Sequence, residues 1–229
     1  MWRLLVMVVV AGLAMGVIGS ACSGERLSAE EEFGQRIEKF GETAYTVTYQ
    51  MDVISEGEPS ASRSVVYSDG TSRRVDNQRD GVLTISISTE EIRYRCSDNS
   101  EDPPMCFEIR LAGGSSSPAF GLDSIAGQID FVETYQLSPA AGRSIAGVEA
   151  ECFLFEDDRD PEPHTEICLA DDGLVLYGSS RIADVYLATT EAVEIERSVP
   201  DGIFEQPYAL SPCNDGLGSP GCTEADLEN

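Results

Sequence analysis

The sequence predicts an α+β fold in which one large antiparallel sheet carries a few helices on one face. Three observations favour this class: long stretches with two-residue alternation of apolar side chains, Asp-Gly pairs where hairpin turns are needed, and helical spacing in only two short segments. The expected strands come in runs and do not alternate one by one with helices. Such runs are typical of antiparallel sheets, whereas strict alternation would indicate parallel pairing.

The first 21 residues have the composition of an export signal. Arg3 precedes an uncharged apolar stretch, 4–21, that ends in small residues directly before Cys22. These last residues resemble the lipobox of bacterial lipoproteins, in which the signal is cut ahead of a cysteine that receives lipid. An uncleaved anchor and an ordinary cleaved signal are the alternatives, since the stretch is just long enough to cross a bilayer. We expect a signal peptide over 1–21 and a lipidated tether over 22–27, with Cys22 as the lipidation site.

An amphipathic helix and a long half-buried strand open the mature chain. A capping box at Ser28–Glu31 begins the helix, apolar side chains follow at helical spacing, and Gly41 ends it. From residue 43 the apolar period changes to two, which predicts a strand with one buried face. Further strands of the first run are expected at 63–68, 72–76, 82–88, 91–96 and 105–111.

The second half of the chain repeats this strand-rich pattern after an interruption. A Gly/Ser/Pro stretch at 113–118 ends the first run, and apolar spacing over 119–131 predicts a short helical crossover. The domain is expected to span 28–208, and 209–229 to form a flexible acidic tail that contains a cysteine pair. The strands expected in the second run are 134–137, 148–155, 166–170, 174–179, 185–190 and 191–197.

Cysteine spacing predicts disulfides. Seven cysteines occur, and six remain once Cys22 is assigned to lipid, an even number in a chain expected to be exported. They fall into three close pairs that each bracket a Pro-, Asp- or Gly-rich turn, which favours pairing between neighbours. Zinc is disfavoured because no C-x2-C pair is present and His164 is the only histidine. The expected disulfides are Cys96–Cys106, Cys152–Cys168 and Cys213–Cys222.

The charge of the chain excludes several partners. It has 41 Asp+Glu against 15 Lys+Arg, a formal net charge of -26. Removing residues 1–21 takes away one arginine and no acid, which leaves -27 on the exported part. Such a chain repels nucleic-acid phosphates and anionic lipid head groups, so we expect no nucleic-acid partner and no membrane attachment through a basic surface.

The chain contains no motif that predicts catalysis or a metal site. His164 falls in an expected acidic hairpin loop, and the segment around Ser144 is one residue too long for a nucleophile elbow. The acidic run that starts at Asp158 begins like an EF-hand loop, but Pro163 stands where glycine is required. We therefore expect no enzyme, no cofactor and no metal, with a secreted hydrolase built on His164 and Ser144 as the alternative.

Several segments resemble the LolA/LolB-like and LppX/LprG family of exported lipoproteins. The segments are the helix after the tether together with 44–49, 67–76, 145–152, 168–176, 188–190 and an F-x-x-P ending at 203–208. The resemblance implies an unclosed antiparallel β-barrel around helices, with a hydrophobic cavity for acyl chains. The residues expected to line such a cavity are Tyr45, Val47, Tyr49, Met51, Ile85, Ile87, Ile92 and Tyr94.

The functional expectation is a lipid-anchored monomer on the extracytoplasmic face of a bacterial membrane. It would bind a lipid, or the acyl chains of a lipoprotein, for carriage or presentation. The physical reason to expect a ligand is that two short helices are too few to cover one face of a sheet of about ten strands. A non-enzymatic envelope sensor or protein-interaction module of the same fold, with no lipid ligand, is the alternative.

Overall fold

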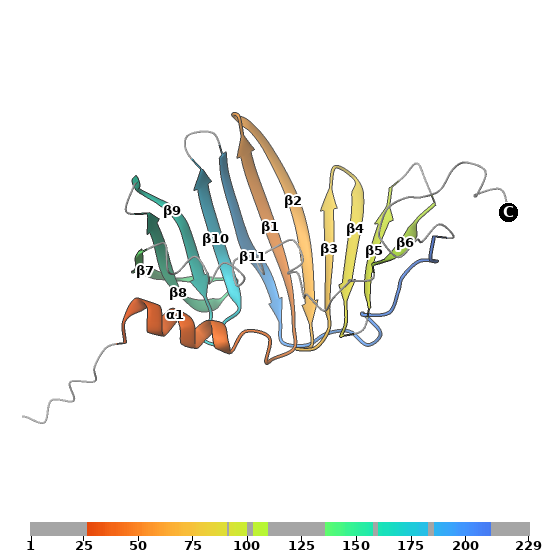
Figure 1. The fold of residues 1–229 in the computed structure, drawn as a ribbon, viewed down its shortest axis with the longest axis horizontal. Helices are drawn as coiled ribbons and strands as arrows, with labels where there is room; N and C mark the ends of the chain where they lie inside the picture. The colour runs from red at the N-terminus through yellow and green to blue at the C-terminus, as the bar shows by residue number, and fades with distance from the viewer. Residues whose placement is uncertain are drawn as a thin grey trace, which may run out of the picture.

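A single helix and eleven strands make up the computed structural model, which describes residues 27–90, 92–99, 103–109, 136–157, 160–182 and 186–211. The strands form one antiparallel sheet in the order β6-β5-β4-β3-β2-β1-β11-β10-β9-β8-β7 (Figure 1). The elements are α1 (Ala29–Glu38), β1 (Tyr45–Ser55), β2 (Glu58–Ser68), β3 (Arg73–Arg79), β4 (Val82–Ser88), β5 (Arg93–Asp98), β6 (Met105–Ile109), β7 (Gln136–Ile145), β8 (Val148–Asp157), β9 (Asp160–Leu169), β10 (Val175–Ile182) and β11 (Tyr186–Glu196).

The sheet consists of two meanders that join where β1 pairs with β11. Among the described residues it is not closed, because β6 and β7 each have only one strand neighbour. The expected α+β class is confirmed in part: the described residues are mostly β, in one antiparallel sheet, with α1 as their one helix. The second expected helix, at 119–131, lies outside the described residues.

Three tight turns set the register of the meanders. Glu56–Gly57, Asp80–Gly81 and Ala146–Gly147 each connect two strands with positive φ at both turn residues. Two-residue turns of this hand match the natural twist of a hairpin, and glycine accepts positive φ without strain. The Asp-Gly turn predicted at Asp80 is confirmed, and it pairs Arg79 with Val82 across the hairpin.

Some strand boundaries differ from the expected ones for identifiable reasons. The two strands expected at 185–190 and 191–197 are one strand, β11, whose alternation is broken by a register shift opposite Thr48 and Tyr49. Strand β9 begins at Asp160, far earlier than expected, because pairing with β8 outweighs its Pro- and acid-rich sequence. His164 therefore lies in a strand and not in the loop where it was expected.

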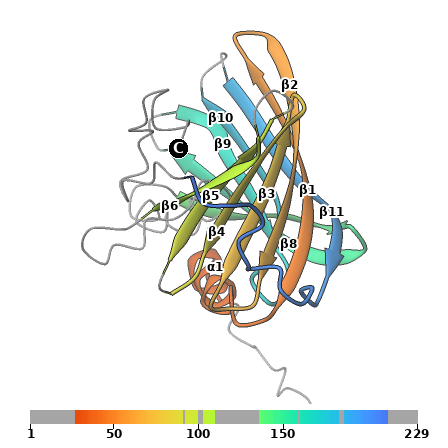
Figure 2. The ribbon, with the colours of Figure 1, turned by 90° about the vertical axis from the view of Figure 1, so that its right-hand side faces the viewer.

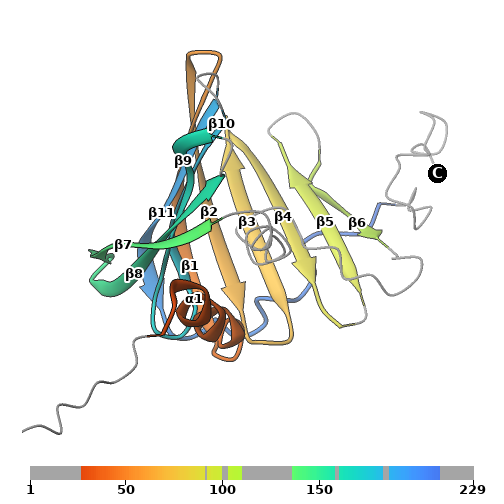
Figure 3. The same cartoon turned by 60° about the vertical axis from the view of Figure 1, so that its left-hand side comes forward.

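The predicted capping box begins α1, and the helix packs on one side of the sheet. Ser28 Oγ accepts from the Glu31 amide at 3.2 Å, and Glu31 Oε2 accepts from the Ser28 amide at 2.9 Å. Phe33 is 3% exposed and lies edge-on to Phe153 and Phe155, with ring centroids 5.3 Å apart in both pairs. We call the side of the sheet that α1 covers the helix side, and the sheet curls round this side (Figure 3).

The opposite side is covered in part by the chain after β11. Residues 199–211, here called the strap, cross β3–β6 on the side away from α1 (Figure 2), and we call this the strap side. Phe204 and Tyr208 pack on the buried cluster of Ile85 and Ile87. At its end the strap pairs with β6, since the Cys106 amide donates to Ala209 O at 2.9 Å and the Ser211 amide donates to Cys106 O at 2.8 Å.

Two of the predicted disulfides are present. Cys96–Cys106 joins β5 to β6, and Cys152–Cys168 joins β8 to β9, in each case between residues that face each other in the register. The third predicted pair, Cys213–Cys222, and the predicted lipidation site Cys22 lie outside the described residues. Within the described ranges, no helix is both long and apolar enough to traverse a membrane.

Candidate functional site

The helix side of β1 is occupied by the core of the protein. Tyr45, Val47 and Tyr49 are 3%, 0% and 4% exposed and belong to a buried cluster with Leu174 and Leu176. Phe40, just after α1, stacks at a tilt on Tyr45, with ring centroids 6.2 Å apart. The Tyr49 hydroxyl donates to Val175 O at 2.8 Å, and burial raises the pKa of Tyr49. These three cavity candidates therefore contact protein side chains.

The eight residues expected to line one cavity are divided between the two sides of the sheet. Val47 pairs with Val66, Val66 with Val75 and Val75 with Ser86, so the helix side of β4 carries Ser86. Ile85 and Ile87 point to the strap side, are 1% exposed and lie under the strap. Met51 is half-buried on the helix side. Tyr94 is half-buried and packs against the cluster of Ile85 and Ile87, and Ile92 is half-buried in the β4–β5 turn. The structure therefore does not bring all eight residues together on one side of the sheet.

The helix side of β3–β6 has an unexpected composition. Alternation along these four described strands places only arginines as charged residues on this side, and no aspartate or glutamate. A chain with 41 acids against 15 bases thus presents a locally basic surface, here called the arginine face. Its residues are Arg73, Val75, Asn77, Arg79, Val82, Thr84, Ser86, Ser88, Arg93, Arg95, Ser97, Met105 and Phe107.

Cross-strand rows order the arginine face. In one row Ser88 lies between Arg73 and Arg93, and Arg93 Nε donates to Ser88 Oγ at 3.2 Å. In the next row Ser86 pairs with Arg95, and Arg95 pairs with Phe107 of the edge strand. Arg95 is exposed and forms no ion pair within the part of the chain that the structure describes. Its guanidinium group therefore keeps its donors available to solvent or to a ligand.

Arg73 joins this face to the core. It pairs with Ser68, which in turn pairs with Tyr45, and Ser68 is itself only 7% exposed. Burial lowers the pKa of Arg73, while the neighbouring Tyr45 and Tyr49 act in the opposite direction. Burial also raises the pKa of Tyr45, and the positive charge of Arg73 opposes that rise. The arginine face thus begins where the aromatic core ends.

Asn77 carries a buried polar atom on the arginine face. It lies between Ser64 of β2 and Thr84 of β4 on the helix side. Its Oδ1 atom is buried and has no hydrogen-bond partner among the described residues. A buried amide oxygen without a donor costs on the order of 1–3 kcal/mol.

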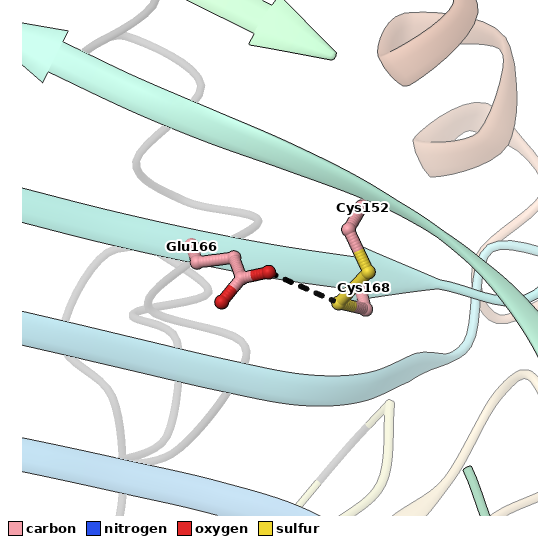
Figure 4. A group of neighbouring side chains, drawn as sticks. All are labelled: Cys152, Glu166 and Cys168. Atoms are coloured by element: carbon pink, nitrogen blue, oxygen red, sulfur yellow. Dashed lines mark hydrogen bonds between the residues drawn. A yellow bond between two sulfur atoms is a disulfide. The ribbon is translucent and has the colours of Figure 1, made fainter. Parts of the chain in front are cut away.

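One cluster has the residue types of a metal site but lacks the free ligands. Cys152, Cys168 and Glu166 lie together at β8–β9 (Figure 4). The two sulfur atoms are bonded to each other, and Glu166 forms an ion pair with Arg143. Because a disulfide sulfur carries no proton, the 4.0 Å approach of Cys168 Sγ to Glu166 is a van der Waals contact. The cluster therefore offers a metal ion no thiolate.

Sequence reasoning did not select the arginine face, although a signal was present. Arg93 and Arg95 share the two-residue period of β5, and Thr84, Ser86 and Ser88 share that of β4. The expectation of an acyl-chain cavity favours the apolar positions of the same strands as ligand contacts. Those apolar positions face the strap.

No family model matches this sequence, and no curated protein matches it at a significant level. Solved structures do match. A crystal structure of MucB in complex with MucA(peri) matches with a TM-score of 0.50 and 16% identity over 78% of this chain. This chain spans 60% of the length of that MucB chain. An uncharacterized conserved protein from Thermus thermophilus matches with a TM-score of 0.48, 13% identity and coverage of 80% of this chain and 98% of that one.

A LolA superfamily protein from Nitrosomonas europaea also matches, with a TM-score of 0.36, 13% identity and coverage of 79% of this chain and 99% of that one. At these identities the comparisons show likeness of fold alone. The fold of this chain is similar to that of MucB.

Proposed function

We propose that this protein is a non-enzymatic binding protein of the bacterial envelope that engages a protein partner through its arginine face. The observation that carries the proposal is that this side of β3–β6 is polar, and that arginines are its only charged residues among those the structure describes. On the other side of the same strands, the strap covers the apolar residues. A surface of this kind suits a polar partner better than an acyl chain.

The extracytoplasmic location is supported by two independent features. Two disulfides persist where the environment is oxidising, and the sequence before Cys22 has the pattern of an export signal with a lipobox. We propose that lipid on Cys22 tethers the mature chain to the outer side of the membrane. The MucB structure provides a precedent for this fold in a protein complex, since that protein was crystallised with MucA(peri).

Carriage of a lipid or of lipoprotein acyl chains is the second candidate function. Met51 and Val53 support it, because they extend the apolar helix side of β1 beyond the packed core and are half-buried. A carrier of this kind would hold its ligand near β1 and β2, away from the arginine face.

Position-dependent photocrosslinking in intact cells distinguishes these functions. A photoreactive phenylalanine analogue replaces Ser86 on the arginine face or, as a matched control, exposed Gln78 on the strap side of neighbouring β3. The proposal expects a discrete protein adduct from position 86 and none from position 78. Equal adducts at both positions, or a lipid adduct from 86, would contradict it. Native mass spectrometry that finds lipid bound to the purified chain would favour the carrier.

A further inference from the structure

We infer that the arginine face recognises an extended, acidic segment of the partner protein. This inference rests on the proposed function and specifies the chemistry of the partner. Its first support is charge: every charged side chain on the helix side of described strands β3–β6 is an arginine, in a chain of net charge -26. Such a local reversal gives a basic surface to which carboxylates are attracted at short range.

The spacing of the arginines fits an extended chain. Arg93 and Arg95 are two residues apart on β5, so their backbones repeat at about 6.8 Å, the distance between alternate residues of any extended peptide. Arg73 and Arg93 are separated by one intervening strand, or about 10 Å. The arginine side chains thus start from regularly spaced backbone positions along and across the strands. Such an array matches several carboxylates spaced along a polypeptide better than it matches one compact head group.

The remaining residues of the face add hydrogen bonds and a narrow apolar border. Hydroxyl groups of Thr84, Ser86 and Ser88 lie between the arginines and can bond to the backbone of a bound segment. Phe107 and Met105 on the edge strand are half-buried and accept occasional apolar side chains. Acyl chains find few apolar partners here, since serine and threonine occupy the helix side of the middle of β4.

Net charge does not prevent this binding. An acidic partner is repelled by the whole chain at long range, but salt screens charges beyond about 8 Å at physiological ionic strength. Direct contacts between arginine and carboxylate act over shorter distances and persist. A flat anionic membrane is disfavoured because the sheet curls round the helix side, where the face lies, and the rest of the molecule is acidic.

Fluorescence anisotropy with a labelled Glu-Thr repeat peptide of about twelve residues tests the inference on the mature chain at about physiological salt. The matched probe is the corresponding Gln-Thr peptide. The test variant is Arg93→Gln with Arg95→Gln. Its control is Arg63→Gln with Arg181→Gln, which removes the same charge from exposed strap-side positions.

We expect the Glu-Thr peptide to bind at least tenfold more tightly than the Gln-Thr peptide. The Arg93/Arg95 variant should lose at least tenfold in affinity and the control less than twofold. Arg95→Gln alone, at an exposed position, gives the same direction of change if the double variant unfolds. Equal losses in both double variants would overturn the inference, as would binding of phosphatidylglycerol vesicles in place of the acidic peptide.

The two proposals fail in different ways. If position 86 gives a crosslink but the acidic peptide does not bind, the proposed function stands. The inference that the partner segment is acidic is then overturned. Absence of both the crosslink and the peptide binding would overturn both proposals.

Discussion

Arg36 holds the C-terminal half of α1 to the sheet. Its side chain is buried and forms ion pairs with Asp171 at 2.9 Å, Glu151 at 3.0 Å and Glu32 at 3.6 Å. The turn at Gly173 approaches the Arg36 carbonyl so closely that a Cβ would lie 2.0 Å from the oxygen, and φ there is +80°. Glycine is therefore required at this contact.

Replacing Arg36 should destabilise the fold. Arg36→Ala leaves three carboxylates close together without their cation, so we expect a loss of about 2–3 kcal/mol in the free energy of unfolding, measured by urea denaturation. Arg197→Ala is the control, because the Arg197 side chain is 42% exposed against 11% for Arg36, so its pair with Asp172 should contribute about 1 kcal/mol or less. Similar losses in both variants would show that burial of Arg36 does not matter.

Glu151 gives stability a defined pH dependence. A hydrogen bond with Glu32 raises the pKa of Glu151, burial adds to the rise, and Arg36 opposes it. The folded state therefore binds more protons than the unfolded chain between the two pKa values. The stabilisation from this group is present in acid, below the unfolded pKa, and is lost as pH rises through the folded pKa.

Glu151→Gln removes this titration. We expect the variant to gain stability relative to the wild type as the pH is raised from about 4 to about 7, since glutamine has no proton to lose. Urea unfolding of both proteins across this range gives the difference directly. A difference that does not vary with pH would contradict the assignment.

At the scale of elements, the strap and the disulfide at β5–β6 act together. Cys96–Cys106 crosses the two outer strands at the point where β6 bonds to Ala209 and Ser211. Arg74 Nη1 donates to Ile203 O at 3.0 Å, and the Tyr208 hydroxyl donates to Asp98 Oδ2 at 3.1 Å. The strap thus covers Ile85 and Ile87 and shields one edge of the sheet from pairing with other chains.

Removal of this disulfide should loosen the outer strands first. For Cys96→Ala with Cys106→Ala we expect a loss of about 3 kcal/mol, together with faster hydrogen exchange in β6 and the strap. Cys152→Ala with Cys168→Ala is the comparison, since it should change exchange in β8 and β9 and leave the strap protected. Unchanged exchange in the strap of the first variant would argue against the coupling.

Strand existence was largely predictable from the sequence, and the side that each strand presents was not. Val82–Ser88 was predicted with its observed bounds because alternation and the Asp80–Gly81 turn agree. The strand predicted at 166–170 is shorter than the observed β9, because prolines and acidic residues have low strand propensity. Pairing with β8 overrides this low propensity in the fold. Whether Ile85 or Ser86 faces α1 depends on register across four strands, and a shift of one residue reverses the answer.

For the whole molecule, acidity and the proposed lipid tether would together determine how the chain sits at a membrane. Residues 22–229 have a formal charge of -27, since Arg3 is the only charged residue in 1–21. A domain of this charge is repelled by anionic lipids. Its retention at the membrane would then depend on the lipid at Cys22.

Substitution of Cys22 tests this dependence. Cys22→Ser should move the mature chain from the membrane fraction to the soluble fraction, most completely at low salt, where repulsion is least screened. The fold should be unaffected, since Cys22 lies outside the described sheet. Immunoblots of separated fractions provide the measurement, and full retention of the Cys22→Ser protein in membranes would contradict lipid tethering.

Binding through the arginine face is the central claim, and charge reversal within it is the most direct test. The photocrosslink from position 86 is repeated in intact cells after Arg95→Glu, with Arg63→Glu on the strap side as the matched control. The account predicts that the protein adduct falls at least fivefold with Arg95→Glu and stays unchanged with Arg63→Glu. An adduct of undiminished yield after Arg95→Glu would contradict it.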